Sequence, residues 1–326
     1  MREPNYVIIT PARNEEPHLP KTIESVASQT LQPQQWILVN DGSTDDTGRI
    51  MDAAARQHSW IKAVHRSDRG FRKSGGGVIE AFYDGYAQLS AANPQPSTSS
   101  RSRAPHSTLS SQPSTSSWDY LVKLDGDLSF NASYFADCFE RFEAEPRLGI
   151  GGGTICGLID GVLSAECPGD PPFHVRGATK IYRRACWEAI GGLMKAPGWD
   201  SLDELKANML GWKTSTFRDL KLHQHRQTGA ADGSWKNWVK NGRANYITGY
   251  HPLFMLFKCF KRTFEAPYRI AALGLLTGFI TGYLKREPRV QDKEVIKYVR
   301  RQQLNRLTFR ESLWDQRPRP CEKQQA

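Results

Sequence analysis

Short apolar runs alternate with amphipathic stretches over the first 125 residues of the chain. Runs rich in Ile, Val, Leu and aromatic residues predict buried strands, at 6–10, 35–40, 61–66 and 120–125. Apolar residues at helical spacing, such as Leu19, Ile23 and Val26, predict helices between them, at 18–30, 47–58 and 78–89. This alternation is typical of an α/β domain with a largely parallel, Rossmann-like sheet.

Each predicted strand ends in a polar or glycine-rich loop. The loops read PARNEE after the first strand, NDGS after the second, RGFRKSGGG after the third and DGD after the fourth. In sheets of this kind, ligands bind at the carboxyl ends of the strands. The four loops therefore predict one ligand site along one edge of the sheet.

The fourth loop carries Asp125 and Asp127 on either side of one glycine. Asp-Gly is a strong turn signal, so a plain turn is one interpretation. A bound cation is the other, because two carboxylates on one tight loop repel each other unless positive charge lies between them. The shared position of the four loops favours the cation, and Mg²⁺ or Mn²⁺ suits oxygen ligands.

The second half of the chain is less regular. A glycine-rich run at 149–159 predicts a strand with close backbone approach, and 177–193 predicts a strand running into a short helix. Residues 203–217 predict a helix that ends at Gly211 and leads into a further strand. Residues 93–117 are rich in Ser, Thr and Pro, a composition that predicts a disordered insertion.

Basic residues are concentrated towards the carboxyl end. The formal net charge is +10, and residues 231–326 contain 19 Lys and Arg against 8 Asp and Glu. A basic region binds nucleic acid, anionic lipid or an acidic partner. The six cysteines form no CxxC pair, which argues against a zinc ribbon and against a disulfide scaffold. The first residues lack a signal-peptide pattern, so we expect a cytoplasmic protein.

Taken in order, these motifs resemble those of the inverting family 2 glycosyltransferases, which have the GT-A fold. The resemblance runs over about residues 5–228 and rests on ITPARNEE, LVNDGSTDDT, RGFRKSGGG, KLDGDL, RGATKIYRRACWEAIGGL and GWD…DELKANMLGWKT. It implies a nucleotide-sugar donor and a divalent metal, Mg²⁺ or Mn²⁺. The processive members carry several long membrane spans and a Gln-x-x-Arg-Trp motif; this sequence has neither, so we expect a non-processive enzyme.

The resemblance also implies roles for individual residues. Asp127 is then a metal ligand, Asp125 contacts the donor ribose or reaches the metal through water, and His225 is a candidate ligand of the metal or the diphosphate. The other implied donor-binding residues are Pro11, Arg13 and Glu15 around the nucleoside, Asp41 as an acceptor from the base, and Arg72 and Lys73 as charge partners of the diphosphate.

An inverting transfer needs a general base that takes the proton of the attacking acceptor hydroxyl. Three carboxylates are candidates: Asp200, Asp203 and Glu204. Counting back from Gly211, as the family pattern implies, reaches Asp200. The adjacent acidic pair at 203–204 remains the alternative, since this sequence departs from the family's usual Glu-Asp pair, and any of the three carboxylates can instead cap the helix.

Two apolar stretches, 250–260 and 268–284, lie in the basic region. Both are shorter than the roughly 20 residues that span a bilayer comfortably. We expect a helix pair that lies in an anionic membrane surface, with a buried core helix and a full membrane span as alternatives.

Together these inferences predict a catalytic domain at 1–230 and a basic, helical extension at 231–326. We expect a metal-dependent, hexosyltransferase-type enzyme that transfers sugar to a glycan or lipid-linked acceptor at the cytoplasmic face of a membrane. A sugar nucleotidyltransferase is one alternative, but those enzymes carry a basic glycine-rich loop directly after the first strand. A nucleic-acid-binding protein is the other, and no recognisable module of that kind is present, so no nucleic-acid partner is expected.

Overall fold

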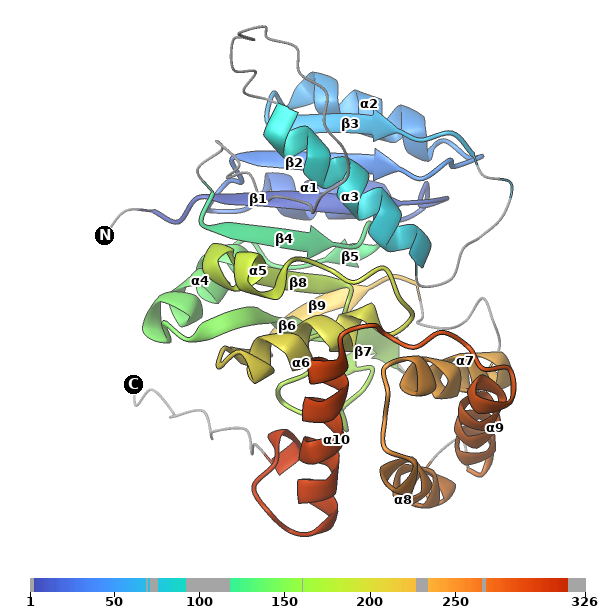
Figure 1. Cartoon of the computed structure of the whole chain (residues 1–326). Coiled ribbons are helices and arrows are strands. Elements are labelled where there is room, and N and C mark those ends of the chain that lie inside the picture. The colour runs from blue at the N-terminus through green and yellow to red at the C-terminus, as the bar shows by residue number, and fades with distance from the viewer. Residues whose placement is uncertain are drawn as a thin grey trace, which may run out of the picture.

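The computed structural model describes residues 3–68, 70, 76–91, 118–159, 161–226, 234–265 and 268–315. The predicted insertion at 93–117 and the candidate residues Arg72 and Lys73 lie outside this part of the chain. A mixed sheet of nine strands forms the centre of the molecule (Figure 1). The strands are β1 (Tyr6–Ala12), β2 (Gln35–Asn40), β3 (Ile61–His65), β4 (Tyr120–Leu124), β5 (Leu128–Ser129), β6 (Leu148–Ile159), β7 (Val162–Ala165), β8 (Thr179–Arg183) and β9 (Lys213–Gln224).

The first half of the sheet is parallel. Strands β3, β2, β1 and β4 lie side by side in that order, each hydrogen-bonded to the next in parallel register. Beyond β4 the order continues β8, β6, β9, β5, in which only β6 and β9 pair in parallel. The predicted α/β fold is therefore confirmed, with a parallel half that extends into a mixed half.

Helices cover both faces of the sheet, because successive strand residues point to opposite faces. On one face the core side chains of α1 (Leu19–Ala27), α2 (Thr47–Gln57) and α4 (Tyr134–Ala144) pack on β1 residues such as Tyr6 and Ile8. On the other face α3 (Gly76–Ala91), α5 (Arg184–Ile190) and α6 (Trp199–Met209) pack against Val7 and Ile9.

Strand β1 is longer than predicted, since it runs through Pro11 to Ala12. Proline has no backbone N–H and is tolerated only where a strand lacks a partner to receive one. The pairing of β1 with β4 stops at Ile9, whereas its pairing with β2 continues to Ala12. Pro11 therefore lies where one side of β1 is open, at the carboxyl edge of the sheet.

The glycine run in β6 shows the close backbone approach that its sequence predicts. A Cβ atom on Gly152 would lie 2.5 Å from the carbonyl oxygen of Thr179, and one on Gly153 would lie 2.4 Å from that of Leu220. These spacings are far below van der Waals contact, so only glycine fits between β8 and β9 at these positions.

Helix α6 begins at Trp199, four residues before the predicted start. Its N-cap residue, Gly198, has φ of 80°, a left-handed conformation that glycine adopts without strain. The earlier start puts Asp200 in the first turn of the helix and turns Asp203 and Glu204 into its buried face.

The basic extension contains four helices and a short 3₁₀ turn in its described part. These are α7 (Ser234–Ile247), α8 (Pro252–Thr263), α9 (Ile270–Leu284), α10 (Lys293–Leu307) and η1 (Leu313–Asp315). Val295 and Val299 of α10 join a core cluster with Leu202 and Leu205 of α6. The extension is therefore packed against the helix that carries the candidate base.

Helices α7 and α9 approach each other closely through glycines. A Cβ atom on Gly278 of α9 would lie 2.0 Å from the carbonyl oxygen of Val239, and one on Gly242 of α7 would lie 2.1 Å from that of Leu275. The side of α9 that faces α7 is thus fixed by backbone contact. Among the helices in the described ranges, none is both long enough and apolar enough to cross a membrane.

Candidate active site

The loops after β1 and β2 interlock at the carboxyl edge of the sheet. The amide of Asn14 donates to the hydroxyl of Ser43 (3.0 Å), and the amide of Thr44 donates back to the side-chain carbonyl of Asn14 (2.9 Å). The amide of Glu15 donates to the hydroxyl of Thr47 (2.8 Å) at the start of α2. These bonds hold Asn14 in a left-handed conformation with φ of 54° and fix the position of Glu15.

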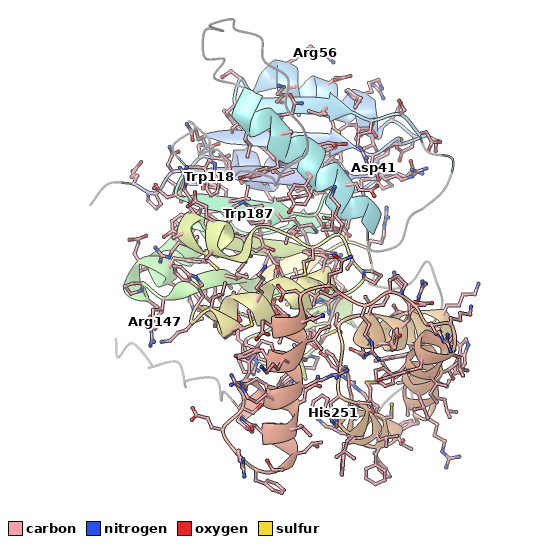
Figure 2. All side chains as sticks on the ribbon, viewed as in Figure 1. Asp41, Arg56, Trp118, Arg147, Trp187 and His251 are labelled. Atoms are coloured by element: carbon pink, nitrogen blue, oxygen red, sulfur yellow. The ribbon has the colours of Figure 1, made fainter. Side chains whose placement is uncertain are left out.

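Asp41 lies at the end of β2, at the opposite edge of the sheet from Trp118 (Figure 2). Its side chain is buried and forms an ion pair with Arg66, whose Nε also lies 2.6 Å from a carboxylate oxygen of Asp84. Arg13 donates from one nitrogen to the backbone oxygen of Asp41 (3.1 Å) and from the other to Asp68 (2.8 Å). Predicted residues Pro11, Arg13 and Asp41 are therefore neighbours at this edge.

A surface cavity of about 500 Å³ opens beside this group of residues. It lies between the end of β3 and α3, and its lining includes Arg66, Ser67 and Asp84. Arg66 therefore contributes to the lining of this cavity and also pairs with Asp41.

Lys123 and Asp125 connect the DGD loop to the segment before β8. Lys123 is a buried cation within β4, and its ammonium group donates to the carboxylate of Asp125 and to the backbone oxygen of Gly177. The amide of Asp125 donates to the backbone oxygen of Ala178 (2.8 Å). The Lys123 nitrogen also lies 5.4 Å from the ring centre of Trp199, so the DGD loop and the start of α6 are adjacent.

Asp127 is buried, and only one of its two carboxylate oxygens has a hydrogen-bond partner among the described residues. One carboxylate oxygen accepts a hydrogen bond from the side-chain amide of Gln224 (3.1 Å), whereas the other, Oδ1, is buried and has no hydrogen-bond partner among the described residues. Burial, followed by the charge of Asp125, raises the pKa of Asp127 to about 6. A buried carboxylate oxygen without a donor is costly, and a cation at this point would satisfy it.

Glu15 adds a third carboxylate to this region. Its side chain forms an ion pair with Arg226 (2.9 Å), which also donates to the backbone oxygen of Asn14 (2.8 Å). Burial raises the pKa of Glu15 to about 8, and although Arg226 opposes this, the charges of Asp127 and Asp125 add to the increase. The three carboxylates therefore lie close enough for the charges of Asp127 and Asp125 to oppose ionisation of Glu15.

The carboxylates around Asp127 suit a divalent cation that is shared with a bound ligand. No group of three or more His, Cys, Asp or Glu side chains in the described part of the chain is close enough to hold a metal by itself. Mg²⁺ usually binds to one or two carboxylates and completes its shell with water and substrate phosphate oxygens. The unpartnered oxygen of Asp127, with Asp125 on the same loop, fits a cation of that kind bound together with a diphosphate.

His225 lies next to Asp127 through the backbone, since its amide donates to the backbone oxygen of Asp127 (2.9 Å). Its imidazole Nε2 is 3.0 Å from the hydroxyl of Ser129, and its ring stacks on that of His18 with 6.0 Å between centres. Burial lowers the pKa of His225 to about 4, with further lowering by His223. The ring is therefore neutral near pH 7, and its Nε2 already has Ser129 as a hydrogen-bond partner.

The three candidate bases differ sharply in their surroundings. Asp203 and Glu204 are fully buried at the side chain, and every one of their carboxylate oxygens has a partner. Asp200 is partly exposed, and no hydrogen bond or ion pair from the described chain reaches its carboxylate. Its Cβ lies 3.3 Å from the position that a side chain on Gly177 would occupy, next to the carbonyl that Lys123 binds.

Four ionisable side chains form the buried network behind α6. Lys180 of β8 lies 2.9 Å from Asp203 and 2.8 Å from Glu204, and the imidazole Nδ1 of His174 lies 2.9 Å from Glu204. Burial opposes protonation of His174, but the charge of Glu204, the hydrogen bond to Glu204 and the charges of Asp200 and Asp170 together outweigh it and raise the pKa of His174 to about 9. Two carboxylates therefore face two basic side chains, so each buried charged group has a partner of opposite sign.

Sequence reasoning missed several residues that contact the predicted ones: Lys123, Lys180, Gln224 and Arg226. Lys123 and Lys180 could have been identified from the sequence, because a lysine inside an otherwise apolar strand needs a buried partner. Gln224 and Arg226 flank His225, but their contacts are long-range. The pairing of β9 with β5 brings Gln224 to Asp127, 97 positions away, and Arg226 contacts Asn14 and Glu15 near the start of the chain.

The chain is similar to known proteins in part of its sequence and in its fold. Residues 7–77 match the family model described as glycosyl transferase family 2. The uncharacterized glycosyltransferase EpsJ of Bacillus subtilis is 33% identical over 96 residues, 27% of this chain and 28% of EpsJ. The glycosyltransferase GlyG of Streptococcus pneumoniae is 35% identical over 63 residues, 19% of this chain and 21% of GlyG. The chain thus spans less than a third of the length of either relative.

Two solved structures share the fold at low sequence identity. The mannosyltransferase PcManGT of Pyrobaculum calidifontis, in complex with GDP-Man and Mn²⁺, superposes with a TM-score of 0.53 at 14% identity and covers 91% of this chain and 79% of its own. Residues 1–349 of S. aureus TarS, in complex with UDP-GlcNAc, give a TM-score of 0.50 at 14% identity and cover 90% and 78%. Residues 7–77 are therefore similar to glycosyltransferase family 2, and the chain shares the GT-A fold of the two solved glycosyltransferases.

Proposed function

We propose that the protein is an inverting, non-processive, hexosyltransferase-type glycosyltransferase that moves a sugar from a nucleotide-sugar donor to a lipid-linked or polysaccharide acceptor. The observation that carries the proposal is that two carboxylates in different surroundings, Asp127 and Asp200, lie on connected loops at the carboxyl edge of the sheet. Asp127 has a buried oxygen without a partner among the described residues, and the carboxylate of Asp200 is partly exposed. Lys123 and Gly177 connect the loops that hold them.

The donor would lie across the carboxyl ends of β1, β2 and β4. Pro11, Arg13, Glu15 and Asp41 would form the nucleoside side, the diphosphate would lie over the DGD loop, and Arg72 and Lys73 remain its proposed charge partners from the sequence. Asp127 and Asp125 would hold a divalent cation, with His225 beside them. When bound, Mg²⁺ or Mn²⁺ neutralises the charge of the departing diphosphate. The relative solved with GDP-Man and Mn²⁺ supports this assignment by analogy of fold.

Asp200 is the proposed general base. A base must be able to approach the acceptor hydroxyl, and the carboxylates of Asp203 and Glu204 are buried and fully paired. Asp200 would take the proton of the acceptor hydroxyl while its oxygen bonds to the anomeric carbon from the face opposite the nucleoside diphosphate. The bond to the diphosphate breaks as this bond forms, so the product has the inverted anomeric configuration. Asp203 and Glu204 then act on the position of Asp200 through the packing of α6.

We further propose that residues 1–230 form the catalytic unit and that residues 231–326 hold it at the cytoplasmic face of a membrane as a peripheral protein. A sugar nucleotidyltransferase remains the alternative of a different class. The nucleic-acid alternative is weaker, because the acidic groups around Asp127 repel phosphate unless a cation is bound.

Product analysis tests the proposal. The full chain is incubated with Mn²⁺, a panel of UDP-, GDP- and dTDP-sugars and lipid-linked or oligosaccharide acceptors, and the products are nucleoside diphosphate and a glycoside whose anomeric proton is assigned by NMR. Inverted product in one combination supports the proposal, whereas retained configuration contradicts it. Formation of pyrophosphate from a sugar 1-phosphate and a nucleoside triphosphate would identify the nucleotidyltransferase.

A further inference from the structure

Helix α8 exposes one apolar face. Large apolar side chains recur along it at spacings of three and four residues, which places them on the same side of a helix. They are Leu253, Leu256, Phe257, Phe260 and the C-cap residue Phe264, and each is between 44% and 66% exposed. The opposite side of α8 is used for packing, since Met255 and Cys259 are buried.

Helix α9 exposes a second apolar face on the side away from α7. Ile270, Leu273, Ile280 and Leu284 are 44–78% exposed, whereas Gly274 and Gly278 on the other side meet the backbone of α7. Because glycine contacts fix that side, the helix cannot rotate to bury its exposed side chains without losing the contact with α7. We call the exposed side chains of α8 and α9, together with Tyr268 between them, the α8–α9 face.

The α8–α9 face differs from the rest of the described surface. Seventeen large apolar residues are exposed in the described chain, and eleven of them lie between 253 and 284. Those in residues 3–226 are only Leu158, Val162 and Leu210. Contiguous exposed apolar surface of this kind marks an interaction site, whereas scattered apolar residues need no explanation.

The charge around the α8–α9 face is positive. Lys261, Arg269, Lys285 and Arg286 are exposed within the same segment. Its two described carboxylates are already paired, Glu265 with Lys261 and Arg262, and Glu287 with Arg243. The occupant of this face therefore offers apolar volume together with negative charge.

We propose that the α8–α9 face lies in the interfacial layer of an anionic lipid bilayer, with its apolar side chains among the acyl chains and its basic side chains at the headgroups. This rests on and deepens the proposed function. A second copy of the chain is the poorer occupant, because a two-fold pairing of this face would bring the two sets of basic side chains together. An anionic bilayer supplies both the apolar layer and the opposite charge.

Docking in this way fits a lipid-linked acceptor. In Figure 1, α7, α8 and α9 lie at the lower right, on the side towards which β1, β2 and β3 point. The candidate site is also at the carboxyl ends of those strands. A bilayer at the α8–α9 face would therefore present an acceptor headgroup on the same side of the molecule as Asp127 and Asp200.

Vesicle flotation of the full chain tests the proposal. Vesicles contain phosphatidylcholine alone or with phosphatidylglycerol, and the floated fraction is measured at low and high salt. We expect flotation with the anionic vesicles, reduced but not abolished by salt, because salt screens the charges and leaves the apolar contact unchanged. A chain that stays with the soluble fraction at low salt overturns the proposal.

Matched variants separate the apolar and the charged parts. Leu256→Ser with Phe260→Ser removes two exposed apolar groups and should weaken vesicle binding at least about tenfold. Leu158→Ser with Val162→Ser changes two equally exposed apolar residues elsewhere and should leave binding unchanged. Equal loss in both variants contradicts the assignment. Lys285→Glu with Arg286→Glu should weaken binding about tenfold at low salt only, and an effect that persists at high salt also contradicts it.

Two further measurements distinguish vesicle binding from the proposed catalytic function and from dimerisation. Asp127→Asn should float as well as the unchanged chain, because the DGD loop is not part of the α8–α9 face. Light scattering should give a monomer in the absence of vesicles; a dimer that Phe260→Ser dissociates would identify a second copy as the occupant and overturn the bilayer proposal.

Discussion

The ammonium nitrogen of Lys180 lies 2.9 and 3.0 Å from the two carboxylate oxygens of Asp203, and neither side chain is accessible to solvent. Tyr182 donates to the same carboxylate (2.6 Å), and Lys180 also donates to the backbone oxygen of Asp200. The pair therefore connects β8 to the first turn of α6. Because the Lys180–Asp203 pair is buried at this junction, we infer that it fixes the position of Asp200, the residue proposed as the base.

Breaking this pair from one side should destabilise the fold severely. Lys180→Met leaves two buried carboxylates short of a cation, and we expect a loss of about 3–5 kcal/mol in the free energy of unfolding. Denaturant unfolding measures it, with Lys213→Met as the control. Lys213 pairs with Glu145 at the surface, so its loss should cost about 1 kcal/mol or less. Similar losses in the two variants would show that the buried network contributes no more than a surface pair.

Deprotonation of His174 should reduce the folding stability at alkaline pH. Its pKa is about 9 in the folded protein against 6.5 for the ordinary group, because of Glu204 first and then Asp200 and Asp170. The stability that protonated His174 contributes is complete below pH 6.5 and is lost as pH rises through about 9. One pKa unit corresponds to about 1.4 kcal/mol.

The measurement is the melting temperature between pH 6.5 and 9.5 for the unchanged chain and for His174→Gln. The variant should start lower and fall less over this range. Parallel curves would contradict the assignment of the alkaline loss to His174.

Asp200→Asn should separate binding from transfer. The substitution keeps the size of the side chain and removes its basicity, so donor binding should persist while turnover falls by about 10²- to 10⁴-fold. Single-turnover transfer and donor titration measure the two effects. Should Asp203→Asn abolish transfer in a fully folded protein while Asp200→Asn remains active, the base assignment is wrong.

Close packing of α7 and α9 predicts a strong effect at Gly278. Gly278→Ala puts a methyl group 2.0 Å from the carbonyl oxygen of Val239, so the helices must separate. We expect a loss of about 1–3 kcal/mol in the free energy of unfolding. The neighbouring Thr277 is exposed, and Thr277→Ala should have little effect. A stable Gly278→Ala variant would mean that α9 is held less tightly than its backbone contacts indicate.

Local patterns were enough to predict the parallel half of the fold. The strand at 35–40 is found with its predicted bounds, because an apolar run between two turn signals is a local property. The start of α6 was predicted four residues late, since its beginning depends on the positive φ of Gly198 and on the burial of Trp199. The spacing of apolar residues predicts neither the backbone conformation of Gly198 nor the burial of Trp199.

The loops of the candidate site could be predicted from the sequence, but the side chains that contact the site residues could not. The DGD loop and Asp41 follow from polar residues at strand ends. The pairing of Asp203 and Glu204 with Lys180 is set by the packing of α6 on β8, so the sequence alone left three bases open. Likewise, only the pairing of β9 with β5 brings Gln224 to Asp127.

The central claim is that Asp127 and Asp125 bind a divalent cation together with the diphosphate of a nucleotide-sugar donor. The most direct test is calorimetric titration of the full chain with UDP and GDP, with Mn²⁺ and in excess chelator. Asp219→Asn is the matched control, because Asp219 is an exposed carboxylate of β9 that pairs with Arg141. We predict Mn²⁺-dependent binding of at least one nucleotide, weakened about 10²-fold by Asp127→Asn and unchanged by Asp219→Asn. Binding that is equally tight in chelator, or that Asp127→Asn leaves intact, would contradict it.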